Sequence, residues 1–340
     1  MRFFHRAAML GAMVGVTALG VLALDDPPTL MSAAASPDSA VETSDFATST
    51  TSTTTSTTTT TISPVAMAAS DPSLAPVCGA VAGALPGSAG CRIIAFYGNP
   101  LSKRMGILGQ SPKPVMLAGL ASWTKTWQVA DPKTPTKCAL ELIAITAQAS
   151  PGEKNLHRAR LPDAKIDEVL RWAREGGCLL ILDMQVGWSS VPDELPFLEK
   201  WLGEPDVHLG LDPEWDMEPG VVPGSKVGRM TADDIQFAID FVAGIVKAKN
   251  LTPKLVIVHR FRDFMVQNPE LLRPVPEIRL LVNADGFGPP ATKMVTFNIA
   301  RALMPTQLTG FKLFFKNDKP MLQPKDVLPL LPTPVFINYQ

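Results

Sequence analysis

The sequence predicts an α/β protein that folds as a (β/α)8 TIM barrel, preceded by a disordered Thr/Ser-rich N-terminal segment. From residue 91 onward, eight short apolar segments alternate with helical patterns. The 250 residues from 91 to 340 are close to the usual length of one such barrel. Polar residues also gather at the C-terminal ends of the apolar segments, where barrels of this kind carry their functional sites.

Residues 1–23 have the pattern of a secretory signal peptide, because Arg2 and Arg6 precede an uncharged apolar run that ends in small residues before Asp25. An uncleaved membrane anchor is the alternative, since the run is almost long enough to span a bilayer. Residues 24–77 include an unbroken Thr/Ser run at 48–61 and cannot bury enough apolar surface to order themselves. We therefore expect a disordered stalk and a secreted or cell-surface location.

The charge of the chain excludes two classes of partner. The formal net charge is -1 and the isoelectric point is about 6.4. Binding to nucleic acid or to an anionic membrane surface requires a clustered basic field, which this balance does not indicate. We expect no nucleic-acid partner, and contact with a membrane only through an uncleaved N-terminal anchor.

Four cysteines follow the leader, and an even number permits two disulfides in an oxidising compartment. Cys78 and Cys91 would close a short loop before the first strand. Cys138 and Cys178 each precede a predicted strand, so they could meet at one end of a sheet. Buried free thiols are the alternative for this second pair.

The eight segments are apolar on both faces, which is typical of strands in a covered parallel sheet. An open doubly wound sheet is the alternative, but no Gly-rich phosphate loop follows the first strand. The predicted strands are residues 92–97, 140–146, 178–183, 207–212, 254–259, 278–283, 310–315 and 334–339.

Two helices are clearly indicated between these strands. Residues 163–175 carry one apolar stripe and stop at Gly176-Gly177. Residues 231–249 begin with Thr231 as N-cap, followed by two acids that favour the positive helix end. Weaker patterns predict helices at 195–202 and 292–303.

The sharpest motif ends the fourth strand and reads Asp212-Pro213-Glu214. Residues two apart on a strand point the same way, so the two carboxyls should lie about 6.5 Å apart along the chain direction. Two such groups cannot ionise independently, and one pKa should rise to produce a proton donor beside an ionised partner. Glycoside hydrolysis requires this pairing of a protonated carboxyl with an ionised one. The alternatives are an N-cap cluster or a calcium ligand set that adds Asp216 and Glu218.

A D-x-E pair at this position, after a third strand that runs into Gly187-Trp188, resembles the (β/α)8-barrel glycoside hydrolases. The chitinase-like and muramidase-like groups are nearest in pattern. The resemblance implies that Glu214 is the general acid and Asp212 the assisting carboxylate. His208 and Gly210 stand where the chitinase-like pattern has further aspartates, and no Glu ends the seventh strand.

Other strand-end residues complete the candidate site. Asp183 and Asp285 end strands at the same mouth and are further candidate catalytic carboxylates. The candidate substrate-binding residues are aromatic rings that could stack on sugars and polar groups that could bind hydroxyls: Tyr97, Gln185, Trp188, Trp215, His259, Asn283 and Tyr339. Ordinary turn residues after strands are the alternative reading. No HxH, HExxH or clustered Cys/His spacing is present, so no metal or cofactor is expected.

Together these features predict a secreted glycoside hydrolase that acts on an extracellular or cell-wall polysaccharide. The alternative is a non-catalytic carbohydrate-binding or cell-envelope protein on the same barrel, because one fold supports many functions.

Overall fold

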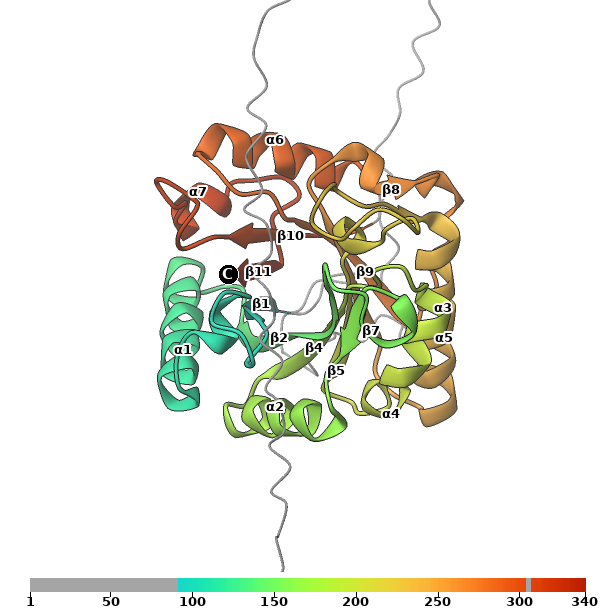
Figure 1. The fold of residues 1–340 in the computed structure, drawn as a ribbon. Helices are drawn as coiled ribbons and strands as arrows, with labels where there is room; N and C mark the ends of the chain where they lie inside the picture. Colours follow the sequence, from blue (N-terminus) through green and yellow to red (C-terminus); the bar gives the residue numbers. More distant parts are fainter. Residues whose placement is uncertain (1–90, 304–306) are drawn as a thin grey trace, which may run out of the picture.

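The computed structural model of the chain describes residues 91–303 and 307–340. Within them, eight parallel strands close into a barrel surrounded by helices, so the predicted (β/α)8 fold is confirmed (Figure 1). The hydrogen-bonded order is β1-β11-β10-β9-β7-β5-β4-β2, and β1 pairs with β2 to close the ring. The predicted signal peptide and stalk, residues 1–77, and the predicted partner Cys78 lie outside the described residues.

All eight predicted strands are present, with ends that shift by a few residues. The barrel strands are β1 (Arg92–Gly98), β2 (Thr136–Ala147), β4 (Leu179–Met184), β5 (Val207–Leu211), β7 (Lys254–Arg260), β9 (Ile278–Ala284), β10 (Leu308–Leu313) and β11 (Phe336–Tyr339). Short β3 (Arg158–Arg160) adds antiparallel to β2, and β6 (Met230–Thr231) pairs with β8 (Val266–Gln267) outside the barrel.

The helices form the outer layer of the barrel (Figure 1). They are α1 (Lys113–Ala130), α2 (Asp163–Glu175), α3 (Val191–Glu194), α4 (Glu199–Leu202), α5 (Ala232–Lys249), α6 (Pro290–Arg301) and α7 (Pro324–Val327). The predicted helix at 195–202 is wrong as one element, because a 3-10 turn (Leu195–Leu198) precedes α4. Helix α5 begins after a capping box in which the Thr231 hydroxyl accepts from the Asp234 N–H, as its sequence indicates.

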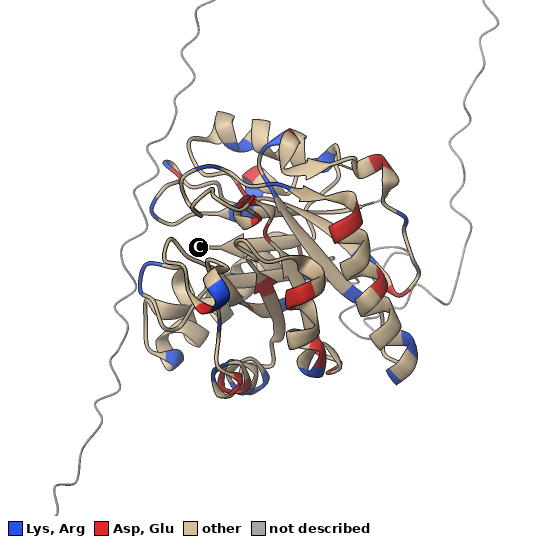
Figure 2. Cartoon of the chain, turned by 45° about the vertical axis from the view of Figure 1, so that its right-hand side comes forward, with Lys and Arg blue, Asp and Glu red and all other residues tan. Residues whose placement is uncertain are grey.

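Two apolar cores stabilise the barrel. The larger core packs the outward faces of the strands against the helices. The smaller core fills the lower barrel interior with side chains that include Ile93, Ile181, Ile257, Leu281 and Phe336. Basic and acidic side chains are interspersed over the outer helices (Figure 2).

The disulfide between Cys138 and Cys178 confirms one of the two predicted pairs and joins the starts of β2 and β4. Such a bond is compatible with an oxidising compartment. In the part of the chain that the structure describes, no helix has the length and apolar character needed to cross a membrane.

Candidate functional site

A polar layer lies directly above the apolar interior of the barrel. Side chains of a strand alternate between its faces, so a residue two positions after an interior residue also points inward. Ala95, Ala139, Ile181, Ile257, Leu281 and Phe336 belong to the interior core, and the residues two positions later are Tyr97, Glu141, Asp183, His259, Asn283 and Asn338. The barrel therefore changes from apolar to polar within one layer, towards the C-terminal ends of its strands.

Hydrogen bonds link the first group of predicted site residues across three strands. The Tyr97 hydroxyl donates to Asp183 Oδ2 over 2.9 Å. The Gln185 amide donates to the Tyr97 oxygen and to Asp212 Oδ2, both over 3.3 Å. Asp183 Oδ1 and Asp212 Oδ1 are buried and have no hydrogen-bond partner among the described residues. These two oxygens are therefore available to a bound group.

His259 is fully buried at the centre of the second group. Its Nδ1 lies 2.8 Å from Asp285 Oδ2, and its Nε2 lies 3.0 Å from Glu141 Oε1. Lys312 Nζ lies 3.0 Å from the same oxygen of Asp285, and the Asn338 amide donates to Glu141 Oε2. Burial alone would lower the pKa of His259, but Glu141 and Asp285 raise it well above its ordinary value. Two carboxylates thus hold the imidazole ring in a fixed orientation.

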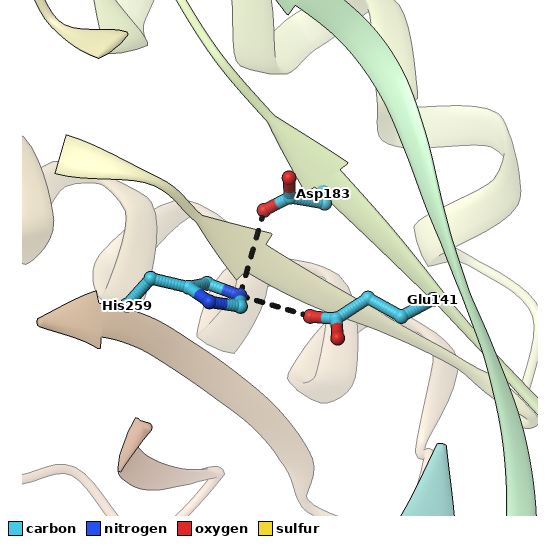
Figure 3. Close-up of side chains that lie close together, drawn as sticks. All are labelled: Glu141, Asp183 and His259. Atoms are coloured by element: carbon cyan, nitrogen blue, oxygen red, sulfur yellow. Dashed lines mark hydrogen bonds and ion pairs between the residues drawn. The ribbon is translucent and has the colours of Figure 1, made fainter. Parts of the chain in front are cut away.

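Glu141, Asp183 and His259 also bring three metal-ligand atoms together (Figure 3). His259 Nε2 lies 3.8 Å from Asp183 Oδ1 and 3.0 Å from Glu141 Oε1. All three ligand atoms lie within 4.8 Å of one another, and all three side chains are buried.

The predicted geometry of the D-x-E pair needs a correction. Strand β5 ends at Leu211, and Glu214 lies on a 3-10 turn (Pro213–Trp215) rather than on the strand. Pro213 occupies the first position of this turn, where its fixed φ and missing N–H are tolerated. The two carboxyls are consequently not related by the pleat of one strand.

The two carboxyls are nevertheless electrostatically coupled. Burial, and after it the charge of Asp212, raises the pKa of Glu214 to about 8. Burial, and after it the charge of Asp183, raises the pKa of Asp212 to about 7. A carboxyl with a pKa near 8 is protonated at neutral pH, so Glu214 can donate a proton there.

The pKa values of two further carboxyls of the layer, Asp183 and Asp285, are shifted in opposite directions. Burial raises the pKa of Asp183 to about 6, although the charge of His259 opposes this rise. Burial would also raise the pKa of Asp285, but Lys312 and then His259 lower it. Asp285 is therefore an anion, held between the cations of Lys312 and His259.

The other predicted substrate-binding residues lie partly in loops and partly inside the barrel. Trp188 and Trp215 lie in neighbouring loops, which are joined where the Gly187 N–H donates to the Trp215 carbonyl over 2.9 Å. The indole of Trp188 donates to the Val221 carbonyl. Asn283 is buried, and its side-chain amide has no partner among the described residues.

Tyr339 does not belong to the mouth of the barrel. Its ring is buried in the outer core against Trp123 and Phe315. Its hydroxyl accepts a hydrogen bond from the indole of Trp127 on α1. The expectation that Tyr339 stacks on a sugar is wrong, because its position on β11 points it outward.

Two charged members of the layer, Glu141 and Lys312, were not predicted from the sequence. Both lie within strands rather than beyond strand ends, and both occupy strand positions that face the inside of the barrel. A single charged residue inside an otherwise apolar strand was the available signal. Such a charge is tolerated only when it is paired, and both residues are paired here.

The predicted calcium alternative is not supported by the geometry. Glu218 is exposed and pairs with Arg229. Within residues 91–303 and 307–340, the group whose ligand atoms converge is the one formed by Glu141, Asp183 and His259, and it includes none of Asp212, Glu214, Asp216 and Glu218.

The fold and the site together define a (β/α)8-barrel protein with a coupled, buried polar layer at the C-terminal end of its strands. No family model matches the sequence of this chain, and no curated protein has a similar sequence.

Proposed function

We propose that the protein is a secreted glycoside hydrolase that acts on an extracellular or cell-wall polysaccharide. The observation that carries the proposal is the placement of two carboxyls, Asp212 and Glu214, directly after β5 at the end of the barrel where catalytic groups of this fold lie. Burial raises the pKa of both groups. A protonated carboxyl next to a second carboxyl is the arrangement that glycoside hydrolysis uses.

In the proposed reaction, Glu214 donates its proton to the glycosidic oxygen. The bond from that oxygen to the anomeric carbon breaks, and its electron pair stays on the oxygen of the departing sugar. Asp212 stabilises the positive charge that develops on the anomeric carbon. Water supplies the hydroxyl of the new reducing end, and its remaining proton restores Glu214 over the cycle.

Asp183 and Asp285 have supporting roles in this proposal. Asp183 is linked to Asp212 through the side chains of Tyr97 and Gln185, so it helps to position the assisting carboxylate. Asp285 stays ionised between His259 and Lys312 and contributes to the raised pKa of Glu214.

A secreted location is part of the proposal. It is supported by the signal-like leader of the sequence and by the Cys138–Cys178 disulfide, which suits an oxidising compartment. A polysaccharide substrate outside the cell is consistent with export.

The experiment compares the full chain with its Glu214→Gln variant on a panel of bacterial cell-wall and plant polysaccharides, and measures new reducing ends. We expect the wild type to release them and the variant to be at least about 100-fold slower. Glu218→Gln is the matched control, because it makes the same change in an exposed position of the same loop.

The non-catalytic alternative has one observation in its favour. His259, Glu141, Asp285 and Lys312 already pair with one another, as they would in a purely structural layer. If neither the wild type nor Glu214→Gln cleaves any glycan and both bind one equally, the protein is a carbohydrate-binding barrel instead.

A further inference from the structure

We propose that Glu141, Asp183 and His259 form a site for one divalent transition-metal cation of the zinc type, inside the barrel. The ligand atoms are Glu141 Oε1, Asp183 Oδ1 and His259 Nε2, which come from β2, β4 and β7 and lie within 4.8 Å of one another (Figure 3).

The distances fit a tetrahedral cation. Zinc binds imidazole nitrogen and carboxylate oxygen at about 2.0–2.2 Å, which places neighbouring ligand atoms about 3.4 Å apart. The measured separations of His259 Nε2 from Glu141 Oε1 and from Asp183 Oδ1 are 3.0 and 3.8 Å, on either side of that value. Small side-chain adjustments would bring all three atoms to one ion.

Asp183 supplies an independent observation that points to a ligand. Its side chain is fully buried, and its Oδ1 has no hydrogen-bond partner among the described residues. Leaving a buried carboxylate oxygen unpaired is costly. A cation at the common point of the three side chains would satisfy this oxygen.

Each ligand also has a partner on its other polar atom. His259 Nδ1 contacts Asp285, Asp183 Oδ2 accepts from Tyr97, and Glu141 Oε2 accepts from Asn338. Outer partners of this type orient the ligands of metal sites, and a carboxylate behind a ligating histidine is one of them. Three side chains thus each present one atom to one point while their second atoms are fixed.

The charges and ligand types identify the class of cation. Two carboxylates and a neutral imidazole carry a charge of −2, which a divalent cation balances. One nitrogen ligand favours zinc or cobalt over calcium and magnesium, which prefer oxygen alone. The cation takes the place of the proton between His259 Nε2 and Glu141, and that proton is released to solvent. Lys312 remains on Asp285, at the opposite edge of the ring.

The test uses the metal alone and the full chain. Purified protein is stripped with a chelator and dialysed against zinc chloride, and bound zinc is measured by elemental analysis. We expect one equivalent per wild-type chain and at least about tenfold weaker binding by Asp183→Asn and by Glu141→Gln. Asp212→Asn is the matched control, because it removes a neighbouring buried carboxylate that is not one of the three ligands. This variant should still bind one equivalent of zinc.

A second measurement needs only the wild type and so does not depend on whether the variants fold. With cobalt(II) in place of zinc, the exchangeable N–H proton at Nδ1 of His259 should give a strongly shifted proton resonance that resists solvent exchange. An unshifted His259 resonance, or zinc binding that folded Asp183→Asn retains in full, would overturn the proposal. Neither readout uses a glycan, so a negative result for the metal site would not count against the hydrolase proposal, which is tested by the release of reducing ends.

Discussion

Gly210 on β5 lies opposite Asp183 on β4, and a Cβ atom at Gly210 would stand 2.9 Å from Asp183 Oδ1. It would also approach the Asp183 Cα and Cβ atoms to 3.2 and 3.3 Å. The absence of a side chain at Gly210 therefore makes the room that the Asp183 carboxyl occupies inside the barrel. Gly210 stands where the chitinase-like pattern has an aspartate, and the space needed by Asp183 explains why a glycine is found there.

Gly210→Ala should destabilise the protein by about 1–3 kcal/mol, because a methyl group would overpack a filled interior. It should also weaken zinc binding, since Asp183 must move. Urea unfolding measures the first effect and zinc dialysis measures the second.

Gly244→Ala on α5 is the matched control for this substitution. Beyond the adjacent residues and the backbone of its own helix, no atom lies within 4 Å of a Cβ built there, so alanine should stabilise the helix by about 0.5–1 kcal/mol. Equal effects of the two substitutions would contradict the packing argument.

The barrel could be predicted because its strands are buried on both faces. The prediction for β7, 254–259, differs from the observed strand by one residue. Strand β2 begins at Thr136, before its predicted start at 140. The earlier residues were not predicted because the first three are only half-buried and lack an apolar pattern. Helix α1 was not predicted, since it has no side-chain cap and no acid in its first turn.

The candidate site was predictable only at strand ends. Asp183, Asp212, His259 and Asp285 do meet in one layer, as expected from the geometry of parallel strands. The partners of His259 could not be identified in this way, because Glu141 lies in the middle of β2. Pairing across the barrel joins residues 118 positions apart, and no local pattern encodes such a contact.

Tyr97→Phe should reduce stability by about 1–3 kcal/mol, because the Tyr97 hydroxyl both donates to Asp183 and accepts from Gln185 inside the barrel. The carboxyl carbon of Asp183 should also change its ¹³C chemical shift at constant pH. Chemical denaturation and carbon-detected NMR provide the two measurements.

The chain contains one other tyrosine, which makes the control direct. Tyr339→Phe removes the acceptor of the Trp127 indole in the outer core and should also destabilise the protein. It should leave the Asp183 resonance unchanged, and a shift of that resonance in both variants would refute the assignment of Tyr97 to the polar layer.

The Cys138–Cys178 disulfide should contribute about 4 kcal/mol to stability, because it closes a loop of 40 residues in the unfolded chain. Replacing both cysteines by serine should lower the unfolding free energy by about that amount. Glu141 and Asp183 lie in the layer above this bond, and the two cysteines pack into the outer core, so zinc binding at saturating metal should be retained. A loss of binding in the folded double variant would show that the bond shapes the site.

Glu214→Gln should make the protein more stable at alkaline pH. The ordinary pKa of a glutamate is 4.5, and the folded-state pKa of Glu214 is about 8. Between these values the folded state holds a proton that the unfolded state has lost, so wild-type stability falls as pH rises through this window. Below pH 4.5 the group is protonated in both states and contributes no such dependence.

Glutamine cannot ionise, so the variant avoids this loss. Each unit of pKa difference corresponds to about 1.4 kcal/mol, and we expect the variant to exceed the wild type by at least about 1 kcal/mol at pH 9. Urea unfolding at intervals from pH 5 to pH 9 measures the difference. The control Glu218→Gln, at an exposed position of the same loop, is measured over the same range. A Glu214→Gln difference that stays constant over this range would mean that Glu214 is ionised at neutral pH, and it would remove the proton donor from the proposed reaction.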